Sequence, residues 1–208
     1  MEFALSEYLP IVSSFVLVLS FIPLIGKIRK NRSASGVSLL MMSFGVAQST
    51  YFIAYNVFFE RFFMVLPFVV TGLLSALILY YFIRYNASTK QRNQLALLLG
   101  ASALPFTLLM ITNLAASVVF EALTYLGLVM SSIRVMPQTY KTLKSGDVSN
   151  LSARYFSLQF LAGGIGLAAE LSLAHVSVAH VMMFVMILLT NAAQLGCIQY
   201  YRSRPALA

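Results

Sequence analysis

Tryptophan is absent from this chain of 208 residues, which also has a single cysteine, two histidines and six acidic residues. The lone thiol, Cys197, cannot form an internal disulfide, and so few cysteines and histidines give no cluster with metal-ligand spacing. No nucleophile paired with a base recurs along the apolar segments, so the sequence predicts neither an enzyme nor a bound metal or cofactor. Charged residues make up only 10% of the chain, too few to cover a water-soluble globule.

Long apolar runs dominate the rest of the sequence. Hydrophobic residues make up 60% of the chain, and its mean hydropathy is +0.85. A helix needs about 20 apolar residues to cross a hydrocarbon layer. Runs of about that length cover residues 7–28, 37–59, 62–85, 94–111, 114–136, 151–174 and 178–201. We therefore predict an all-α integral membrane protein with seven transmembrane helices.

The basic residues orient these helices. All but Arg61 of the 14 lysines and arginines lie near the connections after the first, third and fifth runs or in the C-terminal tail. Positive-inside bias then predicts an outside N-terminus and a cytoplasmic C-terminus, in the plasma (inner) membrane. Lipid phosphates, rather than nucleic acid, are the expected partners of the +8 net charge. Arg134 in particular is expected to snorkel to those phosphates.

One pattern occurs twice, a proline followed 13 and 15 residues later by a small or polar residue and a serine. The copies are Pro23, Gly36 and Ser38 and, 114 positions later, Pro137, Asn150 and Ser152. Internal repeats in an apolar chain are typical of transporters, whose solute site lies between the repeats.

The number of helices in each copy determines the predicted topology. Because three is an odd number, two copies joined directly would be inverted relative to each other in the membrane. The charges instead place both proline loops, the basic segments that follow Pro23 and Pro137, on the same side. Run 94–111 is therefore predicted to be an extra helix that turns the chain over. The expected arrangement is 3+1+3, with parallel triple-helix repeats over 1–86 and 114–208, the latter with a short tail, and a linker over 87–113.

Each repeated proline should disturb its helix. Proline lacks a backbone donor and crowds the preceding turn, so the carbonyls of Leu19 and Ile133 are expected to lose their helical partners. Both helices are therefore predicted to kink near the cytoplasmic side. A matched pair of kinks favours a hinge, and the alternative is a static kink whose freed carbonyl is satisfied by neighbouring groups.

The repeated pattern resembles the PQ-loop superfamily, and its seven-helix form resembles the SWEET branch of sugar transporters. The second copy has Gln138 after its proline, whereas the first copy has Leu24 there. The resemblance implies alternating access with Pro23, Pro137 and Gln138 at the gate. It also implies two alternatives, a proton-coupled exporter of amino acids or other small metabolites and a non-transporting receptor like the KDEL receptor.

Polar and aromatic side chains at membrane depth are the candidate solute contacts. The set is Gln48, Tyr51, Tyr55, Phe58, Ser131, Gln159, Asn191 and Gln194. Gln48, Tyr51 and Tyr55 are spaced to share one helical face. Amides and hydroxyls suit a small neutral polar solute such as a sugar, or they tie helices together without touching any solute. SWEET-like proteins carry an asparagine on the helix that corresponds to the one with Asn191. They also place a tryptophan against the sugar, and here an aromatic side chain of run 37–59 would have to replace it.

A transporter coupled to ions is expected to carry charged side chains at mid-membrane depth. Runs 7–28, 37–59, 62–85, 94–111 and 178–201 have none there, so passive facilitation by a uniporter is expected. Glu121 and Glu170 fall toward the outer end, where interfacial solvation and a role at an external gate both stay open. His175 and His180 are expected on a solvated outer surface. The sequence also leaves a homo-oligomer open.

Overall fold

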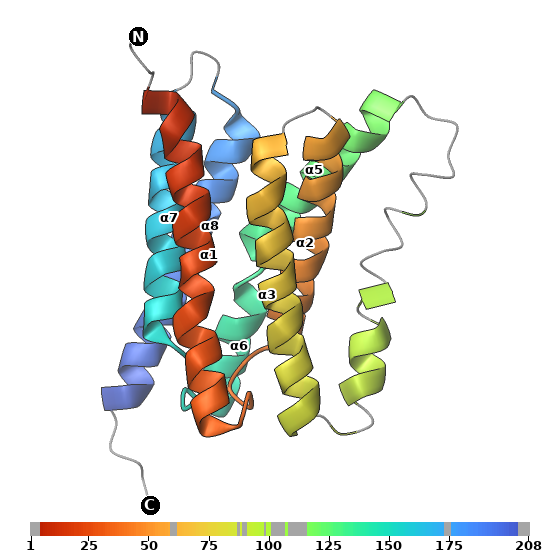
Figure 1. Cartoon of the computed structure of the whole chain (residues 1–208). Helices are drawn as coiled ribbons and strands as arrows, with labels where there is room; N and C mark the ends of the chain where they lie inside the picture. Colours follow the sequence, from red (N-terminus) through yellow and green to blue (C-terminus); the bar gives the residue numbers. More distant parts are fainter. Residues whose placement is uncertain are drawn as a thin grey trace, which may run out of the picture.

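The computed structural model describes residues 5–58, 62–86, 88, 91–97, 99–100, 107, 116–172 and 176–203. These residues form a bundle of α-helices without any strand (Figure 1). The helices are α1 (Leu5–Asn31), α2 (Leu39–Phe58), α3 (Phe62–Asn86), α5 (Ala116–Ile133), α6 (Met136–Ser145), α7 (Ala153–Leu171) and α8 (Val178–Ser203). Most of the predicted linker helix 94–111 lies outside the described residues, and with it the linker of the 3+1+3 arrangement.

Apolar length and outward-facing side chains identify a multi-pass membrane protein. Within the described residues, the helical segments Tyr8–Asn31, Val65–Tyr85 and Val178–Ser203 are long and apolar enough to cross a membrane. Large apolar side chains such as Phe15, Leu66 and Leu189 point away from the bundle and are more than half exposed. Lipid tails can cover these surfaces, whereas exposing them to water would cost free energy.

The sequence repeat is also a repeat in three dimensions. α1 and α6 end 114 residues apart, at Asn31 and Ser145, and α2 and α7 begin 114 residues apart, at Leu39 and Ala153. Packing follows the same symmetry, since the contact of α1 with α7 matches that of α5 with α2, and α2 with α3 matches α7 with α8. In Figure 1, α1 and α5 both start at the upper end, so the two repeats are parallel.

The two prolines differ in their local structure. Pro23 lies inside the continuous helix α1, whereas the second copy is interrupted at Arg134 and Val135 and restarts as α6, with Pro137 in its first turn. At Pro137 the helix that was predicted to kink is therefore interrupted. A proline suits the first turn because its missing N–H would have no helical partner there, and the segment expected to be a loop continues as a helix to a left-handed Gly146 (φ 66°).

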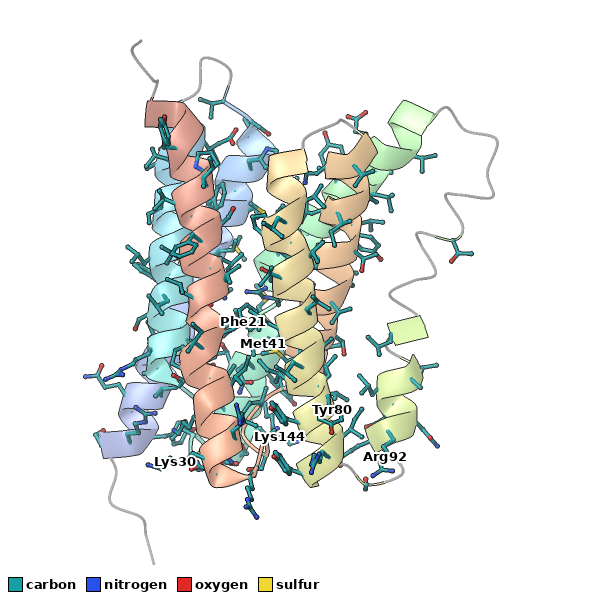
Figure 2. The ribbon with its side chains drawn as sticks, viewed as in Figure 1. Phe21, Lys30, Met41, Tyr80, Arg92 and Lys144 are labelled. Carbon is teal, nitrogen blue, oxygen red and sulfur yellow. The ribbon has the colours of Figure 1, made fainter. Side chains whose placement is uncertain are left out.

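A buried apolar cluster fills the end of the bundle that carries the two proline loops, called the loop end below. Its largest members include Phe21 and Leu24 from α1, Met41 from α2, and Tyr155 and Phe156 from α7. Phe21 and Met41 lie toward the lower half of Figure 2, above the labelled Lys30 and Lys144. The two repeats are thus packed together at the loop end, and space remains between them farther from the loops.

Candidate functional site

A cavity of about 480 Å³ lies between the two repeats. Its walls come from α1, α2 and α3 on one side and from α5, α7 and α8 on the other. Along α7 it extends from Gln159 to Glu170, eleven residues or about 16 Å at the helical rise. The volume is in the range of small-molecule sites, about 300 to 1,000 Å³.

The end of the cavity away from the loops carries two ionisable side chains. Glu170 is half-buried and accepts a hydrogen bond from the backbone N–H of Ser177 (2.8 Å). His180 is half-buried and also lines the cavity, so the expectation that it lies on a solvated outer surface is wrong. The reason is that α8 begins at Val178 and packs against α7, which turns its first residues toward the cavity. His175 lies outside the described residues.

The floor of the cavity, at its end nearest the loops, is built around Arg134. This side chain is only 5% exposed. Its Nη2 donates to Oε1 of Gln159 at 2.6 Å, and its Nη1 lies 3.4 Å from Oε1 of Gln48. Gln159 in turn donates from Nε2 to the hydroxyl of Ser20 at 2.7 Å. The floor therefore joins α1, α2 and α7 through one guanidinium and two amides.

The expected snorkelling of Arg134 to lipid phosphates is wrong. Arg134 directly follows the last residue of α5, and the interruption before α6 leaves its side chain directed into the bundle. Gly45 of α2 lies beside it, because a Cβ there would be in ordinary contact with Cδ of Arg134 at 3.8 Å, whereas it would crowd Oγ of Ser75 at 2.8 Å. The sequence signal was a basic residue close before a motif proline, and it did not say which way the side chain points.

The predicted solute contacts fall into three groups. Gln48, Ser131 and Gln159 line the cavity. Tyr51 is fully buried in a separate cluster with Val119 and Leu123, outside the cavity lining. The side chains of Tyr55 and Phe58 lie outside the described residues.

The two amides of α8 lie away from the cavity lining. Asn191 donates to the carbonyl of Ile187 on its own helix (2.8 Å), and Gln194 donates to the hydroxyl of Thr142 on α6 (3.1 Å). The remaining oxygens of both amides are buried without a hydrogen-bond partner in the part of the chain that the structure describes. Gln194 therefore belongs to the contacts at the loop end.

Gln138 joins the two proline loops. Its Oε1 accepts from the backbone N–H of Ser38 at 2.6 Å, and its Nε2 donates to the carbonyl of Gly36 at 2.9 Å and to the hydroxyl of Thr142 at 3.2 Å. The side chain is fully buried. Leu24, the equivalent residue of the first repeat, instead packs in the apolar cluster. Gln138 thus connects the repeats at the position that the sequence assigned to a gate.

A second pair of cross-repeat contacts comes from two lysines for which the sequence predicted only a role in membrane orientation. Lys27 donates to the carbonyl of Leu151 at 2.8 Å, and Lys141 donates to the carbonyl of Val37 at 2.7 Å and also to that of Ser35. The two contacts are equivalent by the repeat offset, because Lys141 lies 114 residues after Lys27 and Leu151 lies 114 residues after Val37. Each repeat therefore extends one lysine into the loop of the other. A lysine four residues after each proline was the available signal.

Amides complete the closure of the loop end. Asn31 donates to the side-chain oxygen of Asn150 at 2.8 Å, and Asn150 donates to the hydroxyls of Ser33 (3.1 Å) and Ser35 (3.0 Å). Ser35 also donates to the carboxylate of Asp147 at 3.3 Å. These contacts and the apolar cluster separate the cavity from the loop end, while the cavity reaches toward the opposite end of the bundle.

Comparison with known proteins agrees with this description. Residues 5–65 match the family model of the PQ loop repeat. The fold is similar to a solved structure of a eukaryotic SWEET transporter, with a TM-score of 0.65 and 15% sequence identity over 96% of this chain and 100% of that one. No curated protein matches the chain in sequence. The family match supports the resemblance to the PQ-loop superfamily over residues 5–65, and the structural match shows the fold alone.

Proposed function

We propose that this protein transports a small polar solute across a membrane by alternating access between its two repeats. One observation carries the proposal: a cavity between the repeats reaches one end of the bundle and is closed at the other by contacts that cross between the repeats. Separating the proline loops while the opposite ends approach each other would expose the same cavity to the other side.

The predicted orientation gives the direction of this conformation. With the basic loop end in the cytoplasm, the cavity faces outward. Figure 2 supports this choice, since the labelled Lys30, Arg92 and Lys144 all lie at the lower end of the bundle. Transport is proposed to be passive, because the acidic side chain that the structure describes in the cavity, Glu170, lies at its outer end rather than at mid-membrane depth.

A cross-link at the loop end tests alternating access. In a Cys197→Ser background, Ser35→Cys and Asp147→Cys place two thiols where a hydroxyl and a carboxylate now lie 3.3 Å apart. Oxidation should stop solute exchange in proteoliposomes but leave solute binding intact, and a reductant should restore exchange. Each single-cysteine variant serves as the control. Exchange that continues in the fully cross-linked protein would contradict alternating access.

The single variant Asp147→Cys also tests the orientation. In intact cells, a membrane-impermeant thiol reagent should reach this position only after the membrane is opened. Labelling from outside intact cells would place the loop end outside and reverse the predicted topology.

A further inference from the structure

Arg134 is a buried cation whose described partners are all neutral. It lines the cavity, is 5% exposed and is bonded to the side-chain oxygens of Gln48 and Gln159. A guanidinium has five N–H donors. Its Nε has no hydrogen-bond partner among the described residues, and the 3.4 Å contact with Gln48 is long for a hydrogen bond. Nε is itself buried, so the donors left for a solute are the Nη N–H groups that are not bonded to Gln48 or Gln159.

No described carboxylate balances this charge. The acidic side chains that the structure describes are Glu121, which is exposed, Asp147, which lies at the loop end, and Glu170. Glu170 lies about 16 Å farther along α7 than Gln159 and binds Ser177 instead. A buried ion is costly unless a counter-ion compensates it, and amide oxygens do so only in part.

The cavity can supply that counter-ion from a solute. Arginine presents a planar fork that matches the two oxygens of a carboxylate or the oxygens of a phosphate, and such pairs strengthen when water is excluded. Gln48 and Gln159 hold the guanidinium at the end of a cavity of about 480 Å³, which limits the solute to a small molecule. The sequence predicted a neutral solute from the amides and hydroxyls at membrane depth and, separately, placed Arg134 at the lipid phosphates.

We propose, building on the transport function above, that the solute is a small organic oxyanion whose acidic group binds the guanidinium of Arg134. Its carboxylate or phosphate would lie at the floor of the cavity, and the rest of the molecule would extend toward Glu170 and His180.

Matched ligands test this preference on the purified full-length protein. Glucose, glucuronate, glucose 6-phosphate, lactate and inorganic phosphate are compared by calorimetry and by thermal stabilisation. We expect at least one anion to bind about ten to one hundred times more tightly than glucose. Carboxylates and phosphates form separate arms, which identify the acidic group. Glucose binding as tightly as every anion tested, or no binding by any anion, would overturn the proposal.

Substitutions assign the preference to Arg134. Gln159→Glu keeps the cation but gives it a built-in counter-ion, so it should raise the melting temperature without ligand and abolish anion binding. Arg134→Gln should also abolish it, whereas Arg134→Lys should retain part of it. Gln199→Glu, the same change at an exposed position of α8, is the control and should bind like wild type. Unchanged anion binding by Gln159→Glu would show that Arg134 is only a structural tie between helices.

Binding and transport are measured on the same preparations. Anion binding through Arg134 without flux in proteoliposomes would contradict the transport function but support the assignment of the ligand. Flux of a neutral solute that is insensitive to Arg134→Gln would support transport and overturn the oxyanion.

Discussion

Ser20 and Arg134 occupy the same position in the two repeats, 114 residues apart, and both are hydrogen-bonded to Gln159. The position equivalent to Gln159 in the first repeat is Gly45, whose backbone lies against Arg134. In both of these cross-repeat contacts a small residue of the first repeat, Ser20 or Gly45, lies against a large residue of the second, Gln159 or Arg134. This complementarity lets a symmetric backbone carry a charge on one side of its cavity only.

The first prediction concerns the lysine pair. Lys27→Met and Lys141→Met each remove a charge-assisted hydrogen bond to the other repeat, a contact worth about 1.5 to 3 kcal/mol. The double variant should open the loop end. In a Cys197→Ser background, a thiol at the buried position Met42 should then react with a maleimide at least about ten times faster. Lys144→Met, an exposed position of α6, is the control. An unchanged rate in the double variant would mean that the lysines do not hold the loop end closed.

The second prediction is that the two repeated prolines act unequally. Pro23→Ala restores a donor inside α1, so it should stiffen that helix, raise the melting temperature and slow exchange. Pro137→Ala adds an N–H in the first turn of α6, where it has no helical partner, and should change stability by less than about 1 kcal/mol. Exchange rates and melting temperatures of both variants decide this. Equal slowing by both would favour two equivalent hinges, as the sequence suggested.

Gln138→Leu, the third prediction, gives the second repeat the residue that the first repeat has at Leu24. It leaves the N–H of Ser38 and the carbonyl of Gly36 without their present side-chain partner, at a cost of about 1 to 3 kcal/mol. The conformation in which the loop end is closed should therefore be less populated. The rate of solute exchange should change, and the solute should bind less tightly to the outward-facing cavity. Gln199→Leu is the exposed control. If binding and exchange both equal those of wild type, Gln138 is not part of the gate.

The fourth prediction tests coupling. If transport is passive, Glu170→Gln should leave the final accumulation unchanged, and at zero membrane potential a proton gradient should not drive uptake above equilibrium. The amide oxygen of the variant can still accept from Ser177, so the local structure is kept. Proteoliposomes with and without an uncoupler give the comparison. Concentrative uptake that needs both the gradient and Glu170 would instead support the proton-coupled alternative.

The fifth prediction is a pH dependence at the loop end. Partial burial opposes ionisation of Asp147, but hydrogen bonds from Ser149 and Ser35 and the charge of Lys141 hold the pKa of this carboxyl below its usual range. A lowered folded-state pKa stabilises the fold above the unfolded value, about 3.9, and this stabilisation is lost as the pH falls through the folded pKa.

Melting temperatures across a pH series test this sign. Wild type should exceed Asp147→Asn by a constant margin above about pH 5, and the two should converge in acid. A margin that grows as the pH falls would contradict the assignment.

The amino-acid sequence by itself showed that the chain lies in a lipid bilayer, that it contains a repeat, and that the proline loops are important. Apolar length is a local property, so runs of about 20 residues report membrane helices without any knowledge of packing. The offset of 114 residues is likewise written in the chain, and it recurs in the ends of α1 and α6. The same offset relates Lys27 to Lys141, but the sequence alone does not show that each contacts the loop of the other repeat.

Only the tertiary structure decided which side chains meet in the cavity. These helices are apolar on nearly every face, so the sequence does not tell which face turns inward. A rotation about the helix axis separates Gln48, which lines the cavity, from Tyr51, which packs against α5. The interruption after Ile133 turns Arg134 from the lipid toward Gln159, because a proline can begin a helix as well as bend one.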